Sequence, residues 1–443
     1  MAKKTKPQFV CQDCGSAFPQ WLGQCTHCGA WNSIQTATSE LTQPYSVVSL
    51  SQVDHAPKPR YDSRHSEFDR VVGGGLMPAS VTLIGGDPGI GKSTLLLSIA
   101  NGLAIDKKSM YASGEESLEQ VLSRHSRMKL DNNGLLFIST IDIESVLQEA
   151  KERSLDILVI DSIQTVRSAS VGSQAGTVSQ VRECASQLVR FAKESGCTIL
   201  IVGHVTKDGV LAGPRVLEHL VDTVLQFEGD DQNQYRILRA IKNRFGTVHE
   251  IGVFVMTELG IEDVRNPSEL FLGKHSSPMA GSVATAIRTG RRTLLVEIQA
   301  LVDVSYGEYP KRYGQGIDVS RIPMLIAVLA RHSTVALAGH DVFVNAVGGI
   351  SITDCAIDAA ILCALISAFT RTPFPQHMIV CGEVGLLGEI RSVTALSDRI
   401  QEAQQHGFTH AAVPAMHVER LSSQSRIKIV GVEKIQDLLT LLQ

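Results

Sequence analysis

Eight consecutive residues of this chain have the types and the spacing needed to hold a row of phosphates. Residues 86–93 fit the pattern G-x-x-x-x-G-K-[ST], the phosphate-binding P-loop. Its glycines permit positive φ and a close backbone approach, so that successive N–H groups can surround a phosphate. We expect Lys92 to reach the β- and γ-phosphates of ATP and the Ser93 hydroxyl to bind Mg²⁺. The predicted nucleotide-binding residues of this loop are Gly86, Asp87, Pro88, Gly89, Ile90, Gly91, Lys92, Ser93 and Thr94.

The residues on either side of this loop have the context that a P-loop requires. Residues 80–84 form a short β-rich run, and residues 93–103 have the apolar spacing of an amphipathic helix. A strand, a loop and a helix in this order place phosphate at the helix N-terminus, where N–H groups and the helix dipole favour negative charge. A chance match to the pattern is the alternative, and both flanks argue against it.

A second anchor for Mg²⁺ is predicted at the end of another apolar strand. Residues 155–160 lead directly into Asp161, a Walker B pattern in which the carboxylate holds Mg²⁺ through water. Asp156 is the competing carboxylate, but it lies at the start of the strand, at the wrong end for phosphates.

Paired carboxylates follow a further predicted strand, residues 110–113. Glu115 or Glu116 can orient or deprotonate the attacking water, and we favour Glu115 for this role. The alternative is an acidic pair that favours the dipole of the following helix, an explanation that does not exclude catalysis.

Polar residues and two loops surround the same predicted edge of the sheet. Residues 198–202 form a third strand, which leads to His204 and Thr206, two side chains placed to sense the γ-phosphate. Residues 167–176 and 208–219 are polar, Gly-containing loops that could grip a strand of nucleic acid, although ordinary surface loops have the same composition.

Four cysteines near the N-terminus have metal-ligand spacing: Cys11, Cys14, Cys25 and Cys28. Two C-x-x-C turns supply four thiolates, a tetrahedral set that suits a structural Zn²⁺ ion. A pair of disulfides or an iron–sulfur cluster is the alternative, and disulfides are rare in the cytoplasm. We expect Phe9, Phe18, Trp21 and Trp31 to pack around the metal, with stacking of the two tryptophans on nucleic acid as the alternative. The five other cysteines lie in apolar surroundings and are expected to be reduced.

Composition bounds the class of protein. The chain has 443 residues, 44% of them hydrophobic, and a formal net charge of −4, which argues against a generally basic nucleic-acid binder but not against local basic loops. No apolar run has the length of a membrane span and no apolar segment follows the basic N-terminus, so we expect a cytoplasmic protein without a membrane partner.

The pattern along the chain divides it into four parts. Residues 1–32 form the four-cysteine module, and residues 33–60, rich in Ser, Thr, Gln and Pro, read as a linker. Residues 61–265 alternate strands and helices, which predicts an α/β fold with a mostly parallel sheet covered by helices on both faces. Residues 266–443 mix strands and helices in a second α/β domain, with helices expected at 356–369 and 396–405.

Several motifs carry a resemblance to a known family. Walker A, the Glu-bearing strand end, Walker B and the polar strand end occur in the order of a RecA-type ATPase core, and residues 242–246 read Lys-Asn-Arg-Phe-Gly. With the four-cysteine N-terminus, Ser-Gly-Glu-Glu-Ser at 113–117 and Gly-His-Val-Thr-Lys at 203–207, the chain resembles the RadA (Sms) family of bacterial DNA repair proteins over nearly its whole length. Its C-terminal part is similar to the Lon protease domain, notably at residues 341–349 and 382–391.

The resemblance implies roles for further residues. Lys242 and Arg244 would reach a neighbouring subunit's γ-phosphate like an arginine finger or couple it to DNA; a surface basic patch is the alternative. In the Lon-like domain the Ser-Lys dyad is missing, because Ala356 lies near the nucleophile position and Ser397 near the lysine position. Cys355 is a weak substitute without a base. We therefore expect a proteolytically inactive domain that supports oligomerisation and offers arginines to phosphates.

Three functions remain open from the sequence. The resemblance implies a DNA-dependent ATPase of recombinational repair, a hexameric ring that binds single-stranded DNA and branched intermediates and acts with the recombinase RecA. A nucleotide-regulated adaptor without translocation is the second possibility. An ATP-dependent protease is the third, and the missing dyad argues against it.

Overall fold

The structure is a computed structural model, and it describes residues 9–11, 16–18, 22–31, 33–36, 59–204, 216–229, 235–273, 277–307 and 309–442. The chain forms two compact units, residues 1–57 and 58–443. Among the described residues, no helix is both long and apolar enough to cross a membrane.

The first unit contains a small antiparallel sheet in the order β2-β1-β3, with bounds Ala17–Phe18, Phe9–Cys11 and Ile34–Thr36. Because β3 pairs along β1, this fold continues beyond residue 32, where the sequence placed its end. Cys25 is buried, and Phe9, Phe18 and Leu22 pack around it. Trp31 is 72% exposed, so the expectation that it packs there was wrong, and Trp21 lies outside the described residues.

The second unit begins with a nine-stranded sheet in the order β12-β11-β10-β9-β4-β8-β7-β5-β6. The strands from β9 to β6 in this order run parallel, and β10, β11 and β12 extend the sheet with antiparallel hairpins. The mostly parallel α/β sheet predicted from the sequence is confirmed. The strand bounds are β4 Val81–Gly86, β5 Ser109–Ser113, β6 Leu136–Ser139, β7 Ile157–Asp161, β8 Thr198–His204, β9 Thr223–Gly229, β10 Tyr235–Asn243, β11 Ile251–Thr257 and β12 Gly260–Asp263.

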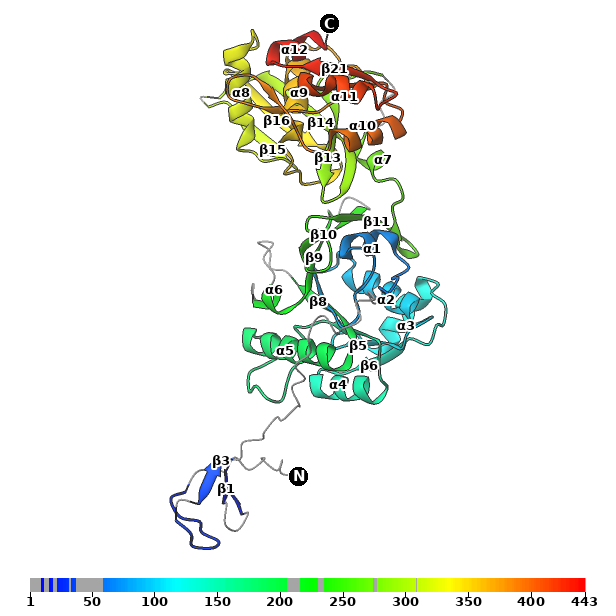
Figure 1. Ribbon diagram of the computed structural model, residues 1–443, viewed down its shortest axis with the longest axis vertical. Coiled ribbons are helices and arrows are strands. Elements are labelled where there is room, and N and C mark those ends of the chain that lie inside the picture. The colour runs from blue at the N-terminus through cyan, green and yellow to red at the C-terminus, as the bar shows by residue number, and fades with distance from the viewer. Residues whose placement is uncertain are drawn as a thin grey trace. The chain divides into compact units, whose positions relative to one another are not determined.

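Helices cover both faces of this sheet (Figure 1). One apolar cluster joins the sheet to α1 and α2, and a second joins its other face to α4, α5 and α6. Every residue of the central strands β4, β5 and β7 is buried, which explains their continuous apolar runs. The helix bounds are α1 Ser66–Val72, α2 Lys92–Leu103, α3 Leu118–Arg127, α4 Ile143–Glu152, α5 Val178–Ser195 and α6 Val216–Leu220.

The second unit ends with a seven-stranded sheet in the order β15-β16-β14-β13-β17-β20-β21. Its strands are β13 Ser282–Thr289, β14 Arg292–Val304, β15 Arg312–Gln315, β16 His340–Ala346, β17 Met378–Val380, β20 His410–Pro414 and β21 Lys428–Val432. The hairpin β18–β19, Glu383–Val384 and Ile390–Arg391, lies apart from it. The helices are α7 Ser268–Phe271, α8 Arg321–His332, α9 Asp358–Thr370, α10 Leu396–Gln405, α11 Val418–Ser422 and α12 Ile435–Thr440.

Helix α9 forms the centre of this domain. Its residues 358–367 are all buried, and a helix that is apolar on all sides belongs inside a core. Helices α8, α9 and α12 cover one face of the seven-stranded sheet, and α10 and α11 cover part of the other. The helix predicted at 356–369 is observed as a short 3₁₀ turn, Cys355–Ile357, followed directly by α9.

Candidate ATPase site

The P-loop joins the central strand β4 to helix α2, in the strand–loop–helix context that the sequence predicted. Gly86 has φ of 158°, and a Cβ atom there would lie 2.5 Å from the Phe227 carbonyl oxygen, so a side chain is excluded at this turn. Gly91 has φ of 113° and precedes the first residue of α2. The loop therefore presents its N–H groups at the N-terminus of a buried helix, where phosphate binds well.

Lys92 folds back into the loop. Its Nζ donates to the carbonyl oxygens of Gly86 at 2.7 Å and Asp87 at 2.8 Å, and the residue is only 4% exposed. Burial lowers the pKa of Lys92, and the nearby charges of Asp161, Asp87 and Glu115 oppose that shift. An ammonium group has three donors, so one stays available for a phosphate oxygen with both carbonyl bonds in place.

The strand register brings four strand ends together where the parallel strands finish. We call this carboxyl end of the strands the P-loop edge of the sheet. Gly86 at the end of β4 lies beside His204 at the end of β8, and Ser113 at the end of β5 lies beside Asp161 at the end of β7. The carboxyl ends of parallel strands form the usual ligand edge of an α/β sheet. The P-loop, the Walker B candidate and the two polar strand ends therefore share this edge.

Asp161 lies in a buried position at this edge. Its carboxylate accepts a short hydrogen bond from the hydroxyl of Tyr111, a fully buried side chain on β5 that the sequence did not single out. The competing Asp156 lies at the other end of the strand, where its carboxylate accepts a 3.0 Å bond from the backbone N–H of Lys108. This arrangement favours Asp161 over Asp156 as the Mg²⁺ anchor.

The two candidate bases point in different directions. Glu115 Oε1 accepts a 2.6 Å hydrogen bond from the Ser162 hydroxyl and lies 3.1 Å from His204 Nε2. Glu116 instead forms an ion pair with Arg124 on α3. Glu115 therefore belongs to the group of side chains around Asp161, and Glu116 is held by its neighbouring helix.

The protonation state of Glu115 suits a base. Burial raises its pKa, but the hydrogen bonds from Ser162 and His204 and the charge of Lys92 lower it more, so the net pKa lies below the ordinary value. The carboxylate is therefore ionised at neutral pH. His204 Nδ1 is buried and has no hydrogen-bond partner in the described part of the chain, whereas Thr206 and the loop 205–215 lie outside it.

Comparison with known proteins places the chain in a family. Residues 50–210 match the family described as AAA domain, and residues 9–36 match the one described as rubredoxin metal binding domain. The DNA repair protein RadA of Escherichia coli is 45% identical, covering 99% of each chain. Those of Haemophilus influenzae and Bacillus subtilis are 45% and 42% identical, covering 100% and 98% of this chain and 99% and 98% of their own.

The chain belongs to the RadA family of DNA repair proteins. It carries the AAA-type ATPase domain and the metal-binding ribbon of that family. The resemblance read from the motifs is confirmed at this level, as is the P-loop ATPase class. The roles of individual side chains rest on the geometry above.

The Lys-Asn-Arg-Phe-Gly motif of this RadA-family chain lies at the opposite edge of the sheet, where the parallel strands begin. Asn243 at the end of β10 pairs with Thr223, the first residue of β9, and Thr223 pairs with Thr82 near the start of β4. From Thr82 to Gly86 the strand advances four residues, about 13 Å at the usual rise per residue. Lys242 and Arg244 are therefore separated from their own P-loop by the length of the sheet.

These two basic residues have different environments. Lys242 Nζ donates to the carbonyl oxygens of Glu218 at 2.6 Å and Val221 at 2.8 Å, which ties it to the end of α6. Burial and the charge of Arg244 lower the pKa of Lys242, while Asp222 and Glu218 raise it. The Arg244 side chain is 57% exposed, with one contact of 3.3 Å to Asp222. Arg244 is thus the more accessible cation of the motif.

The metal-binding ribbon is described in part. Cys25 and Cys28 come from one turn, closed by hydrogen bonds of 2.8 Å from Gly29 N to the Cys25 carbonyl and from Cys25 N to the Ala30 carbonyl. Gly29 has φ of 73°, the conformation for which a knuckle glycine is suited. Such a turn fits two thiolate ligands of a tetrahedral Zn²⁺ site. Cys14 lies outside the described residues, as does the side chain of Cys11.

The region that resembles a protease active site is filled by ion pairs. Ala356 is fully buried, and beside it Asp354 accepts hydrogen bonds from the backbone N–H of Arg288 at 2.8 Å and from Arg399 at 2.7 Å. Arg399 is buried completely, two residues after Ser397. Burial and nearby Glu383 raise the pKa of the Cys355 thiol. The site therefore holds no activated nucleophile among these residues.

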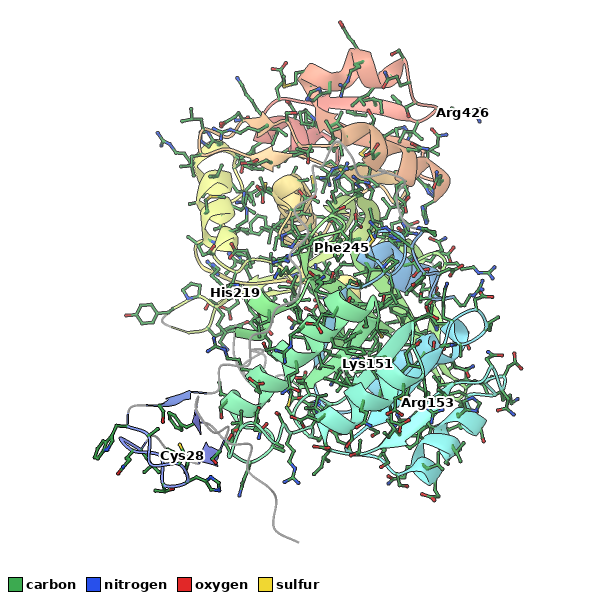
Figure 2. All side chains as sticks on the ribbon, turned by 60° about the horizontal axis from the view of Figure 1, so that its bottom comes forward. Cys28, Lys151, Arg153, His219, Phe245 and Arg426 are labelled. Carbon is green, nitrogen blue, oxygen red and sulfur yellow. The ribbon has the colours of Figure 1, made fainter. Side chains whose placement is uncertain are left out.

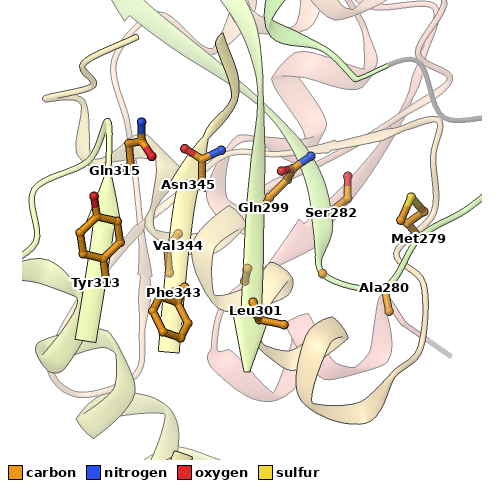
Figure 3. Close-up of a pocket in the computed structure, with 12 residues that line it drawn as sticks. Met279, Ala280, Ser282, Gln299, Leu301, Tyr313, Gln315, Phe343, Val344 and Asn345 are labelled. Carbon is orange, nitrogen blue, oxygen red and sulfur yellow. The ribbon is translucent and has the colours of Figure 1, made fainter. Parts of the chain in front are cut away.

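A hollow of about 500 Å³ lies over β13 to β16 of the C-terminal sheet, and its described lining includes no residue of α10 or α11. Figure 3 shows a row of polar side chains, Gln315, Asn345, Gln299 and Ser282, crossing four strands. The next row contains Tyr313, Phe343 and Leu301, with the two ring centroids 6.4 Å apart. The described lining offers no carboxylate, imidazole, amine or thiol.

Proposed function

We propose that this chain is a DNA-dependent ATPase of recombinational repair that works as a ring, with single-stranded DNA, branched DNA intermediates and the recombinase RecA as its partners. The observation that carries the proposal is the position of Lys242 and Arg244. They lie at the edge of the sheet opposite their own P-loop, so a neighbouring subunit's nucleotide is the one that they can reach. A ring of head-to-tail subunits, a hexamer by the family resemblance, repeats this contact at every interface.

Each half of such a composite site has a defined part. Lys92, Thr94 and the loop N–H groups would bind the phosphates. The Ser93 hydroxyl and Asp161, which the Tyr111 hydroxyl positions, would hold Mg²⁺. Glu115, oriented by Ser162 and His204, accepts a proton from the attacking water. Arg244 of the next subunit stabilises the charge that develops on the transferred phosphoryl group. Mg²⁺ supplies charge neutralisation between phosphate oxygens when bound.

We propose structural roles for the parts of the chain outside the ATPase site. Residues 1–32 and the strand that follows, Ile34–Thr36, are proposed to bind one structural Zn²⁺ ion through Cys11, Cys14, Cys25 and Cys28. The rest of 33–60 is proposed to link them to the ATPase domain at 61–265. Arg60 already belongs to that domain, because its guanidinium binds the carbonyls of Val72 and Phe245. Residues 266–443 are proposed as a Lon-like domain without proteolytic activity that supports the ring in the cytoplasm.

ATP hydrolysis with and without single-stranded DNA, paired with unwinding of a forked substrate, tests this function. We expect DNA to stimulate ATP turnover several-fold and the fork to be opened in an ATP-dependent way. Stimulation without opening would support an adaptor that does not translocate. Cleavage of casein would contradict the assignment of the C-terminal domain, because Ala356 offers no nucleophile.

A further inference from the structure

A cavity of about 580 Å³ lies at the edge of the ATPase sheet that is opposite the P-loop. Its lining includes Phe245 of the Lys-Asn-Arg-Phe-Gly motif and four arginines, Arg60, Arg70, Arg291 and Arg292, together with Glu250. Arg291 lies in the turn between β13 and β14 of the C-terminal domain, and Arg292 is the first residue of β14. The other residues belong to the ATPase domain. Two parts of the same compact unit therefore build one basic cavity.

The contact that forms this cavity is well anchored. Arg292 donates to Glu67 on α1 at 2.5 Å, and the backbone N–H of Arg291 donates to Glu250 at 2.6 Å. Glu67 and Glu250 are both nearly fully buried. Ile237, Ile251 and Val253 of the ATPase sheet belong to the same apolar cluster as the core of the C-terminal domain. These contacts join the two domains on either side of the cavity.

Two of the four arginines bind other groups of the protein, and the other two can bind a ligand. Arg60 donates to the carbonyl oxygens of Val72, Gly75 and Phe245 at 3.2, 3.2 and 2.6 Å, so it adds a positive charge while holding the motif in place. Arg292 is committed to Glu67. Arg70 is exposed, with one loose contact of 3.5 Å to Glu67, and the exposed side chain of Arg291 forms no ion pair within the described chain.

The charges in and behind the cavity do not cancel. Four guanidinium groups face two carboxylates, those of Glu67 and Glu250, which leaves an excess of two positive charges. Guanidinium groups bind phosphate oxygens with paired, charge-assisted hydrogen bonds. A cavity of this volume is in the range of small-ligand sites. The nucleotide of the same subunit is excluded as occupant, because the P-loop lies at the other edge of the sheet.

We propose that this cavity binds phosphate groups through Arg70 and Arg291. The inference rests on the proposed function, which offers two sources of that chemistry: the backbone of single-stranded DNA and the polyphosphate of a nucleotide held by a neighbouring subunit. With either source, the Lys-Asn-Arg-Phe-Gly motif also contributes to the wall of the phosphate site. Arg60 in that wall donates a hydrogen bond to the Phe245 carbonyl. An occupied cavity is then linked by one side chain to the motif that contains Arg244.

The test compares two double variants of the full chain with equal loss of charge. Arg70→Ala/Arg291→Ala removes the two available arginines, and Lys151→Ala/Arg153→Ala removes two cations at the end of α4 (Figure 2). The probes are a fluorescein-labelled (dT)₃₀ oligonucleotide, followed by anisotropy without nucleotide, and steady-state ATP hydrolysis without DNA. Arg70→Lys/Arg291→Lys, which keeps both charges, is a third variant, and melting temperatures check that all fold alike.

If the cavity binds DNA, the alanine pair at 70 and 291 lowers oligonucleotide affinity at least about tenfold at low salt relative to the control pair. The plot of log affinity against log salt becomes less steep by about 1.4, the value for two lost single-strand contacts. The lysine pair recovers part of the affinity, and DNA-free hydrolysis stays at the control rate. If the cavity binds a neighbour's nucleotide, oligonucleotide affinity matches the control and DNA-free hydrolysis falls instead.

Equal behaviour of the two alanine pairs in both assays would overturn the inference. Absence of DNA binding by the wild-type chain would contradict the proposed function instead, and the hydrolysis assay alone would then decide whether the cavity binds phosphate.

Discussion

Two regions of this chain gather charged residues at the ends of strands and helices. They differ in whether those charged side chains are paired with one another. At the P-loop edge, Glu115, His204 and Lys92 come from different elements and keep hydrogen-bonding capacity that no described residue uses fully. At the protease-like region, Arg399 with Asp354 and Arg321 with Asp358 form ion pairs in which Arg399 and Asp358 are completely buried. The side chains of the first region keep donors and acceptors for a ligand. The second region is closed, because its charged side chains bind one another.

A chemical site and a structural site can be built from the same residue types and still differ in how their charges are used. A site that acts on a substrate must present charge to solvent or to a ligand, at a cost in stability. A buried ion pair whose members satisfy each other offers nothing to a substrate, although losing one partner is costly. Both regions contain acidic and basic side chains. What distinguishes them is whether those side chains are buried in ion pairs with one another.

The largest effect is expected from Lys92→Ala. This change removes the ammonium group that is buried against the loop carbonyls, so the phosphates lose their charge partner. ATP turnover should fall at least about a thousandfold, to background. Steady-state phosphate release measures it, and turnover within a few-fold of wild type would contradict the P-loop assignment.

Glu115→Gln should slow hydrolysis by roughly a hundredfold and leave ATP affinity nearly unchanged, because a lost base affects the chemical step. Glu116→Gln is the matched control: it removes a carboxylate that pairs with Arg124 instead of facing His204, and a few-fold effect is expected. Single-turnover hydrolysis and fluorescent-nucleotide binding separate the two steps. The opposite ranking of the two variants would reverse the choice of base.

At the closed site, Arg399→Met should cost stability and leave ATP chemistry alone. It leaves Asp354 without its buried partner, for which a loss of about 3–5 kcal/mol is typical. Arg391→Met is the control, since Arg391 forms an exposed pair with Glu389. Hydrogen–deuterium exchange of the α10 and β13 segments reads the local stability. Equal protection in both variants would show that the buried pair contributes little.

The smallest effect concerns Cys355. Because burial and Glu383 raise the pKa of its thiol, less of it is thiolate near pH 8 than in a free cysteine. Alkylation by iodoacetamide, followed by mass spectrometry of the peptide, should be a few-fold slower than in an unfolded control and should increase with pH above the ordinary range. Faster alkylation than in the unfolded chain would indicate an activated nucleophile and weaken the contrast between the regions.

The sequence predicted those parts of the site that are contiguous in the chain. The P-loop, the apolar strand ending in Asp161 and the helix at 396–405 are recognisable because spacing and periodicity are local properties. Tyr111 and Ser162 were missed, because their contacts with Asp161 and Glu115 join residues 50 and 47 positions apart. Only the order of strands in the sheet brings such pairs together.

The edge occupied by Lys242 and Arg244 was equally inaccessible to sequence reasoning. It depends on β10 running antiparallel to β9, and a strand reads the same in either direction from its residues alone. The exposure of Trp31 was missed for a related reason: an aromatic residue near cysteines fits a small core as well as a surface, and only the fold decides between them.

Mixed oligomers test whether neighbouring subunits complete each other's ATPase sites. Chains with Lys92→Ala and chains with Arg244→Ala should each be nearly inactive alone. In an equal mixture, up to about a quarter of the interfaces pair an intact P-loop with an intact Arg244, so a corresponding part of the ATP turnover should return. No recovery, with co-assembly proven by native mass spectrometry, would contradict the claim that Arg244 acts across a subunit boundary.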